Sequence, residues 1–106
     1  MIKIKCRFGA TDGYCCFIEN QDFHQENADF NFKGDHLVKK FDEDVKIIEF
    51  KSCKMPNFPQ NIAKNFKNVE KLFIINSNLK SLAKFDLKQF ENLKEIHVTG
   101  NKVEFL

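Results

Sequence analysis

The chain has 106 residues, of which 42% are hydrophobic and 30% charged, and its formal net charge is +2. This length suits one domain with a modest core, and no apolar run approaches the ~18 residues that a membrane-spanning helix needs. Because the basic residues form no run and no aromatic–basic motif accompanies them, the composition does not favour nucleic-acid binding.

The first predicted elements form a hairpin. Residues 2–8 alternate apolar and basic side chains, which predicts a strand, and residues 14–19 predict a second strand after a glycine-containing turn. We expect an antiparallel hairpin with the following opposed pairs: Phe8 with Tyr14, Cys6 with Cys16, and Ile4 with Ile18. This register makes one face apolar and places two cysteines where a disulfide can bridge them.

The other two cysteines, Cys15 and Cys53, have no fixed partner. Cys15 points to the opposite side from Cys16, and Cys53 takes an inward position in the repeat described below. They could form a second disulfide or stay as free core thiols. A zinc site is the less favoured alternative, because the sequence has no C-x-x-C pair and no histidine at finger spacing. We interpret His24 and His36 as surface residues, and we expect neither a metal nor another cofactor.

The rest of the N-terminal part is polar. A loop leads into a third alternating strand at residues 28–32, and a charged connector follows at residues 36–44. We interpret residues 1–44 as a small antiparallel β cap that covers the first apolar row of the segment that follows.

From residue 45 to residue 106 an apolar pattern returns every 24 positions. Each copy has apolar side chains at offsets 1, 4, 6, 11 and 14, a small or polar one at offset 9, and Phe at offset 22 where the copy is complete. The matched residues are Val45, Ile48, Phe50, Cys53, Met55, Phe58 and Phe66; Val69, Leu72, Ile74, Ser77, Leu79, Leu82 and Phe90; and Leu93, Ile96, Val98, Asn101, Val103 and Leu106. This periodicity predicts a leucine-rich repeat solenoid.

Each copy predicts one short strand of a parallel sheet, a turn at offset 9 and an irregular or helical outer limb. In that turn the amide of Asn101 can hydrogen-bond backbone groups, and Cys53 and Ser77 can do less of this. The repeats divide into residues 45–68, 69–92 and an incomplete 93–106. Because stacked repeats bury each other's apolar rows, we expect the third copy to be under-covered and to be a site of self-association.

Several stretches carry a family resemblance. In the cap they are Cys6-Arg-Phe8, Tyr14-Cys-Cys16 and Phe32-Lys-Gly34-Asp-His36, and in the repeats they are Pro59-Gln-Asn-Ile62 with Phe66, Asn78-Leu-Lys-Ser-Leu82 and Asp86-Leu87. On these stretches the whole chain resembles the secreted leucine-rich repeat proteins of insects, especially of midges and mosquitoes. The resemblance implies an extracellular recognition or adhesion protein with a disulfide-bonded cap and many repeats. Cys15 is an additional cysteine, and the chain lacks a signal peptide and stops within its third repeat, so we expect an N-terminal excerpt or a truncated product.

No residue pattern predicts catalysis. Ser52, Ser77 and Ser81 have no histidine at a matching repeat position, and the acidic run at residues 42–44 is most simply a solvated connector. We therefore predict a protein-binding scaffold. The alternatives are a structural cap whose ligand is bound by further repeats, and a metal- or redox-responsive module built on the cysteines.

Any ligand contact is expected on the exposed face of the sheet. The residues that stack there are Glu49, Phe73 and His97 at offset 5, and Lys51, Ile75 and Thr99 at offset 7. Phe73 and Ile75 are large apolar groups of the kind that anchor interfaces. The alternative is that they are ordinary strand residues, or that the cap leans over them. We expect the partner to be a protein and not a nucleic acid, and we expect no segment to span a membrane.

Overall fold

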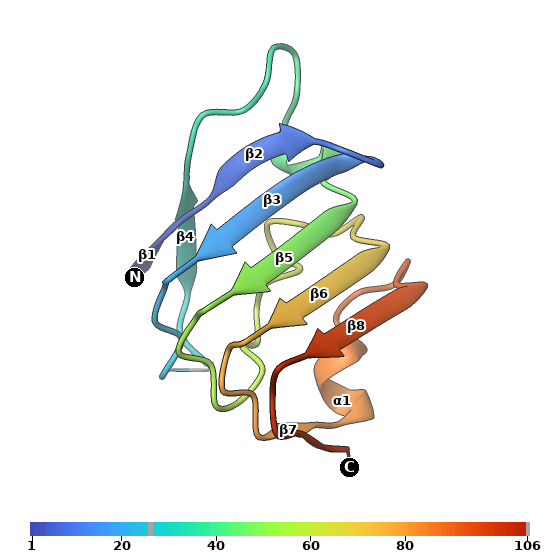
Figure 1. Cartoon of the computed structure of the whole chain (residues 1–106). Coiled ribbons are helices and arrows are strands. Elements are labelled where there is room, and N and C mark those ends of the chain that lie inside the picture. The colour runs from blue at the N-terminus through green and yellow to red at the C-terminus, as the bar shows by residue number, and fades with distance from the viewer. Residues whose placement is uncertain (26, 106) are drawn as a thin grey trace.

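The computed structural model describes residues 1–25 and 27–105, without the side chain of Phe105. Its chain coils into a solenoid-like stack of about four turns. One side of the stack is a five-stranded sheet in the order β2-β3-β5-β6-β8 (Figure 1). The strands are β2 (Arg7–Ala10), β3 (Tyr14–Glu19), β5 (Ile47–Lys51), β6 (Lys71–Ile75) and β8 (Glu95–Thr99). Only the β2–β3 pair in this sheet is antiparallel.

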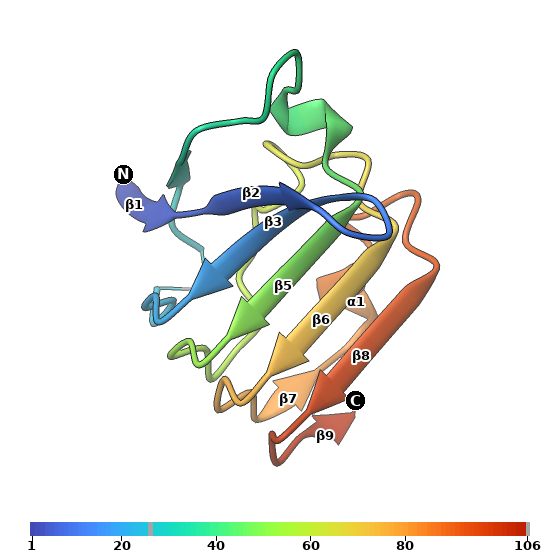
Figure 2. The same ribbon diagram turned by 45° about the horizontal axis from the view of Figure 1, so that its top comes forward.

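The return limbs lie behind this sheet (Figure 2). They contain two small parallel sheets, one of β1 (Ile2–Lys5) with β4 (Phe30–Lys33) and one of β7 (Ser81–Leu82) with β9 (Glu104–Phe105). Their helical elements are a 3-10 turn, η1 (Asp42–Asp44), and a single helical turn, α1 (Lys84–Leu87). Mostly irregular outer limbs are what the repeat pattern predicts.

The expected 24-residue period places equivalent strands in register. Ile48 pairs with Leu72, which pairs with Ile96, and the next inward row follows two residues later. All matched residues of the first two copies are buried: Val45, Ile48, Phe50, Cys53, Met55, Phe58, Phe66, Val69, Leu72, Ile74, Ser77, Leu79, Leu82 and Phe90. Those of the third copy are half-buried, namely Leu93, Ile96, Val98, Asn101 and Val103. Leu106 lies outside the described residues, and self-association of this copy stays a prediction.

Buried phenylalanine rings connect the N-terminal part to the repeats. The ring of Phe50 lies 5.5 Å from that of Phe23 and 5.8 Å from that of Phe58, both in edge-on contacts. Further contacts extend this series of rings, which we call the Phe spine, in the order Phe90, Phe58, Phe50, Phe23, Phe30, Phe32, Phe66 and Phe8. Edge-on and tilted aromatic pairs add to the free energy gained by burial. The high Phe content therefore fills one core shared by cap and repeats.

After each of the four parallel strands of the main sheet, the chain turns at a residue in the left-handed backbone conformation. Asn20, Ser52, Asn76 and Gly100 occupy equivalent places after β3, β5, β6 and β8, and their φ angles are 55°, 54°, 47° and 66°. Glycine and asparagine tolerate this conformation best. At Gly100 a Cβ atom would also collide with the Asn76 side chain. Only glycine fits there without rearrangement.

The turn at offset 9 is stabilised as the sequence indicates. The Asn101 side chain accepts hydrogen bonds from the backbone N–H groups of Ser77 (2.8 Å) and Leu79 (3.2 Å), and it donates to the carbonyls of Ile74 and Thr99. The Ser77 hydroxyl makes only two such bonds, accepting from the Cys53 N–H and donating to the Ile75 carbonyl.

We expect Asn101→Ala to lower the free energy of unfolding by about 2 kcal/mol, because it removes four hydrogen bonds from partly buried backbone groups. Ser77→Ala, which removes two, should cost about 1 kcal/mol. Urea unfolding of both variants measures the difference. Equal losses would contradict the assignment of Asn101 as the stronger turn residue.

The hairpin register that we expected is wrong by two residues. Phe8 lies opposite Cys16, and Ala10 lies opposite Tyr14. Cys6 has left the hairpin, and its N–H donates to the Lys33 carbonyl in the β4 limb at 2.7 Å. The chain therefore changes partners at Cys6, and Ile4 pairs in parallel with Phe32 instead of opposing Ile18.

One close approach and one strand pairing accompany this change of partner. A Cβ atom on Gly34 would collide with the Cys6 carbonyl oxygen, so only glycine lets the two limbs meet there. The other edge of β3 is hydrogen-bonded in parallel to β5. The N-terminal part thus adds β2 and β3 to the solenoid sheet, and of the antiparallel cap that we expected only the β2–β3 pair is antiparallel.

Candidate functional site

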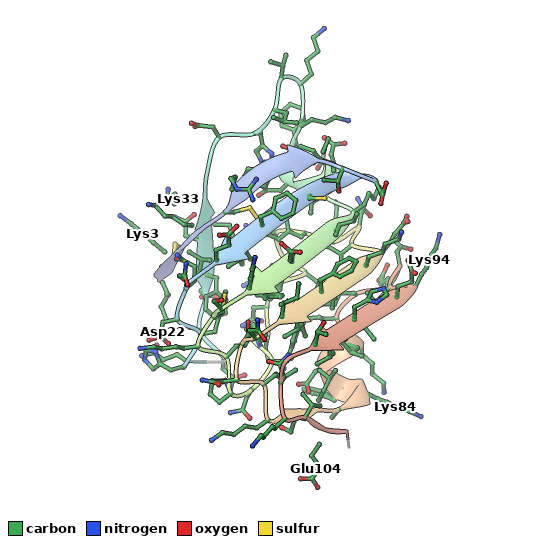
Figure 3. The ribbon with its side chains drawn as sticks, in the orientation of Figure 1. Lys3, Asp22, Lys33, Lys84, Lys94 and Glu104 are labelled. Atoms are coloured by element: carbon green, nitrogen blue, oxygen red, sulfur yellow. A yellow bond between two sulfur atoms is a disulfide. The ribbon has the colours of Figure 1, made fainter. Side chains whose placement is uncertain are left out.

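The open face of the five-stranded sheet is the candidate site, and we call it the sheet face. Its outward residues are Arg7 and Gly9 on β2; Cys15, Phe17 and Glu19 on β3; Ile47, Glu49 and Lys51 on β5; Lys71, Phe73 and Ile75 on β6; and Glu95, His97 and Thr99 on β8. In Figure 3 this face fronts the viewer, and the labelled charged side chains all lie away from its centre. The centre of the face is a row of aromatic and charged side chains.

That central row runs across all five strands. The register places Arg7, Phe17, Glu49, Phe73 and His97 side by side. The Phe73 and His97 rings are stacked, with centroids 4.6 Å apart and planes inclined by 6°. At the other end the Arg7 guanidinium carbon lies 4.4 Å from the centroid of the Phe17 ring. The row is therefore two stacked pairs with one carboxylate between them.

The six residues that we expected at the site lie in two rows of the sheet. Glu49, Phe73 and His97 align in one row, and Lys51, Ile75 and Thr99 align in the next. Phe73 and Ile75 are half-buried, because neighbouring side chains cover part of each. Sequence reasoning missed Arg7 and Phe17, although the alternation of residues 14–19 would have placed Phe17 outward once β3 was joined to the repeat sheet.

Ion pairs satisfy the charges at both ends of the face. Arg7 contacts Glu19 at 3.3 Å, and Lys71 contacts Glu95 at 3.1 Å. These pairs are solvent-exposed and contribute little to stability. Among residues 1–25 and 27–105, Glu49 and Lys51 make no ion pair within 4 Å.

One end of the face is covered by the β2–β3 turn. Cys15 is buried although it points to this side, and its thiol lies 3.3 Å from the Thr11 hydroxyl and from the Gly13 carbonyl oxygen. The same turn passes over Ile47, which is buried. The N-terminal part therefore covers the row of Ile47 and leaves the row of Phe73 open.

The cysteines divide into one bonded and one unbonded pair. Cys6 and Cys16 form the expected disulfide, with their Cα atoms 5.7 Å apart. Cys15 and Cys53 are buried free thiols. Burial raises the pKa of the Cys53 thiol, which keeps it protonated and unreactive. Within the part of the chain that the structure describes, no three potential metal-ligating side chains gather.

The two histidines of the N-terminal part differ in their surroundings. His24 is exposed, and its hydrogen bonds to Asp22 lower the pKa of that carboxyl. His36 is half-buried, stacks on Phe8 and joins the Tyr14 hydroxyl to the Asp42 carboxylate at 2.7 Å on each side. It therefore fastens the connector to the sheet, and our interpretation of it as an ordinary surface residue is wrong.

An open hollow adjoins the sheet face at its β2 end. Its volume is about 570 Å³, and Lys5, Arg7, Phe17, Glu19 and Lys33 contribute to its lining. Arg7, Phe17 and Glu19 also belong to the sheet face. A bound segment could continue from the face into this hollow.

Comparisons of the chain with protein-family models, with curated proteins and with solved structures found no match. None of the helices in residues 1–25 and 27–105 has the length and hydropathy to cross a bilayer. The sheet face therefore has to be interpreted from its own geometry.

Proposed function

We propose that this chain is a recognition module of the leucine-rich repeat type that binds a protein partner on its sheet face. The observation that carries the proposal is the central row, where Phe17 and Phe73 stand on a solvent-facing surface between charged neighbours. Aromatic anchors within a polar surround are typical of protein interfaces. The parallel strands hold these side chains on a rigid support, so little conformational entropy is lost on binding.

The same proposal includes an extracellular location. The Cys6–Cys16 disulfide supports it, because disulfides persist mainly in oxidising compartments. The resemblance to secreted insect leucine-rich repeat proteins points the same way. The 24-residue period, the parallel strands and the asparagine-bonded turn support the leucine-rich repeat assignment.

The test is the double variant Phe73→Ser with Ile75→Ser. Peptides selected from a displayed random library on the immobilised wild-type chain serve as ligands. We expect the double variant to bind them at least tenfold more weakly, because it removes the apolar centre of the face. The melting temperature of the variant shows whether it is still folded.

The matched control is Phe85→Ser. Phe85 lies on α1 in an outer limb, is 70% exposed and is far in the fold from the sheet face. It should leave peptide affinity unchanged. If the double variant binds as well as the wild type, the site lies elsewhere and the proposal is wrong.

A further inference from the structure

Glu49 occupies the centre of the sheet face and is half-buried. It is flanked in register by Phe17 on β3 and by Phe73 on β6. Neighbouring strands are about 4.8 Å apart, so the two Phe positions are about 9.6 Å apart across the carboxylate. The 4.6 Å spacing of the Phe73 and His97 rings shows that side chains in this row follow the strand spacing.

Each of the two flanking rings is covered on one side by a neighbour in the row. Phe73 is covered by His97 on the β8 side, and Phe17 is covered by Arg7 on the β2 side. Since β5 lies between β3 and β6, Phe17 and Phe73 flank Glu49 on opposite sides, and the Phe17 ring also lies next to Gly9 of β2. We call the space over Glu49, between these two side chains, the slot.

This carboxylate has no partner of its own. Among the described residues, Glu49 accepts no side-chain hydrogen bond and forms no ion pair. Two basic residues of the face, Arg7 and Lys71, are already paired with Glu19 and Glu95. Lys51 lies two residues further along β5, is exposed and does not approach Glu49 within 4 Å. A ligand cation can therefore pair with this carboxylate without displacing a partner from it.

We propose that the slot over Glu49 binds an arginine or lysine side chain of the protein partner, an inference that rests on the proposed function of the sheet face. A cation there meets the carboxylate and the two flanking rings, and both contacts attract it. The protein already holds a guanidinium in this way, because Arg7 lies over Phe17 and contacts Glu19 at 3.3 Å. A planar guanidinium suits the space between two rings better than an ammonium does.

The first test uses a pair of synthetic peptides and two forms of the chain. We choose a library peptide that contains arginine and whose binding depends on Phe73. It is synthesised in two forms, one with this arginine and one with glutamine at the same position. On the wild-type chain, we expect the arginine peptide to bind at least tenfold more tightly. On Glu49→Gln, the two peptides should bind within about twofold of each other, as in a double-mutant cycle.

Matched variants separate a local contact from a general charge effect. Glu91→Gln removes an exposed carboxylate from an outer limb and should preserve the arginine preference. Lys51→Gln removes a nearby positive charge and should strengthen binding of the arginine peptide about twofold. If Glu49→Gln and Glu91→Gln weaken binding equally, the slot does not bind the cation and the proposal is overturned.

The second test needs no library. N-acetyl-L-argininamide is titrated at millimolar concentration into the isotope-labelled chain, with N-acetyl-L-glutaminamide as the control. Backbone amide signals of Phe17, Glu49 and Phe73 should shift with the arginine compound alone, and the shifts should vanish in Glu49→Gln. Absence of these shifts in the wild type would overturn the proposal.

The outcomes also separate this proposal from the function on which it rests. Peptides that need Phe73 and Ile75 but show no preference for arginine or lysine would leave the recognition face in place and overturn the cation slot. A selection that yields no peptide dependent on these two residues would contradict both.

Discussion

Replacing Phe50 by Ala is expected to lower the free energy of unfolding by about 3–5 kcal/mol, the usual cost of truncating a fully buried aromatic ring. Phe50 is 0% exposed and lies in the middle of the Phe spine, between Phe23 of the N-terminal part and Phe58 of the first repeat. Its loss therefore opens a cavity where the two parts of the core meet. Urea unfolding followed by circular dichroism measures the change.

Phe85→Ala is the matched control, because it deletes the same ring from a site that is 70% exposed. Its effect should stay within about 0.5 kcal/mol, as is usual for surface substitutions. A domain of this size is stabilised by roughly 5–15 kcal/mol in total, so the Phe50 variant should be close to unfolding at elevated temperature. Similar losses for the two variants would show that Phe50 does not connect the core.

Removing the Cys6–Cys16 disulfide is the second large effect. Its cysteines are 10 residues apart, and closing a loop of about this length stabilises the fold by about 2–3 kcal/mol in the chain-entropy description. The bond also ties the point where the chain passes from β1 to β2 to strand β3, in addition to the hydrogen bond from the Cys6 N–H to the Lys33 carbonyl. The double variant Cys6→Ser with Cys16→Ser should therefore unfold at lower urea concentration.

Reduction supplies the control for that experiment. Dithiothreitol should lower the melting temperature of the wild-type chain to near that of the double variant, and it should leave the variant unchanged. Peptide mapping under non-reducing conditions shows the bond directly. A free Cys6 thiol in protein made in an oxidising compartment would contradict the assignment.

The repeat could be predicted from the sequence because each of its positions has a simple physical requirement. Inward offsets need apolar side chains, as at Leu72 and Ile74, and the turn needs a side chain that bonds the backbone, as at Asn101. These requirements recur at a fixed interval, so each copy supports the interpretation of the others. The residues facing outward follow from the same alternation, which is why the row of Phe73 was placed correctly.

The N-terminal part has no such repetition, and its register could not be predicted. Alternation alone allows Phe8 to lie opposite Tyr14 or opposite Cys16, because both choices keep the same side chains inward. The disulfide did not resolve the choice, since Cys6 reaches Cys16 from outside the hairpin. The pairing of β1 with β4 depends on a close approach at Gly34 that is visible only in three dimensions.

The sequence predicted only part of the candidate site, for a related reason. Phe17 belongs to the hairpin and Phe73 to a repeat, and their common row exists only because β3 pairs with β5. The slot over Glu49 is therefore a product of topology. Its two walls come from segments that no sequence period connects.

The spacing of the coils also determines how the molecule responds to a pulling force. Equivalent backbone bonds, from Glu70 N–H to the Lys46 carbonyl and from Lys94 N–H to the Glu70 carbonyl, join each coil only to its neighbours. A load applied at the C-terminal end meets these bonds one coil at a time, so coils detach in sequence. Equivalent residues of β5, β6 and β8 are 24 residues apart, so detachment of one complete repeat releases about 80 Å of extended chain. Near the other end the disulfide joins Cys6 to Cys16, so the segment between these two residues cannot extend under the same load.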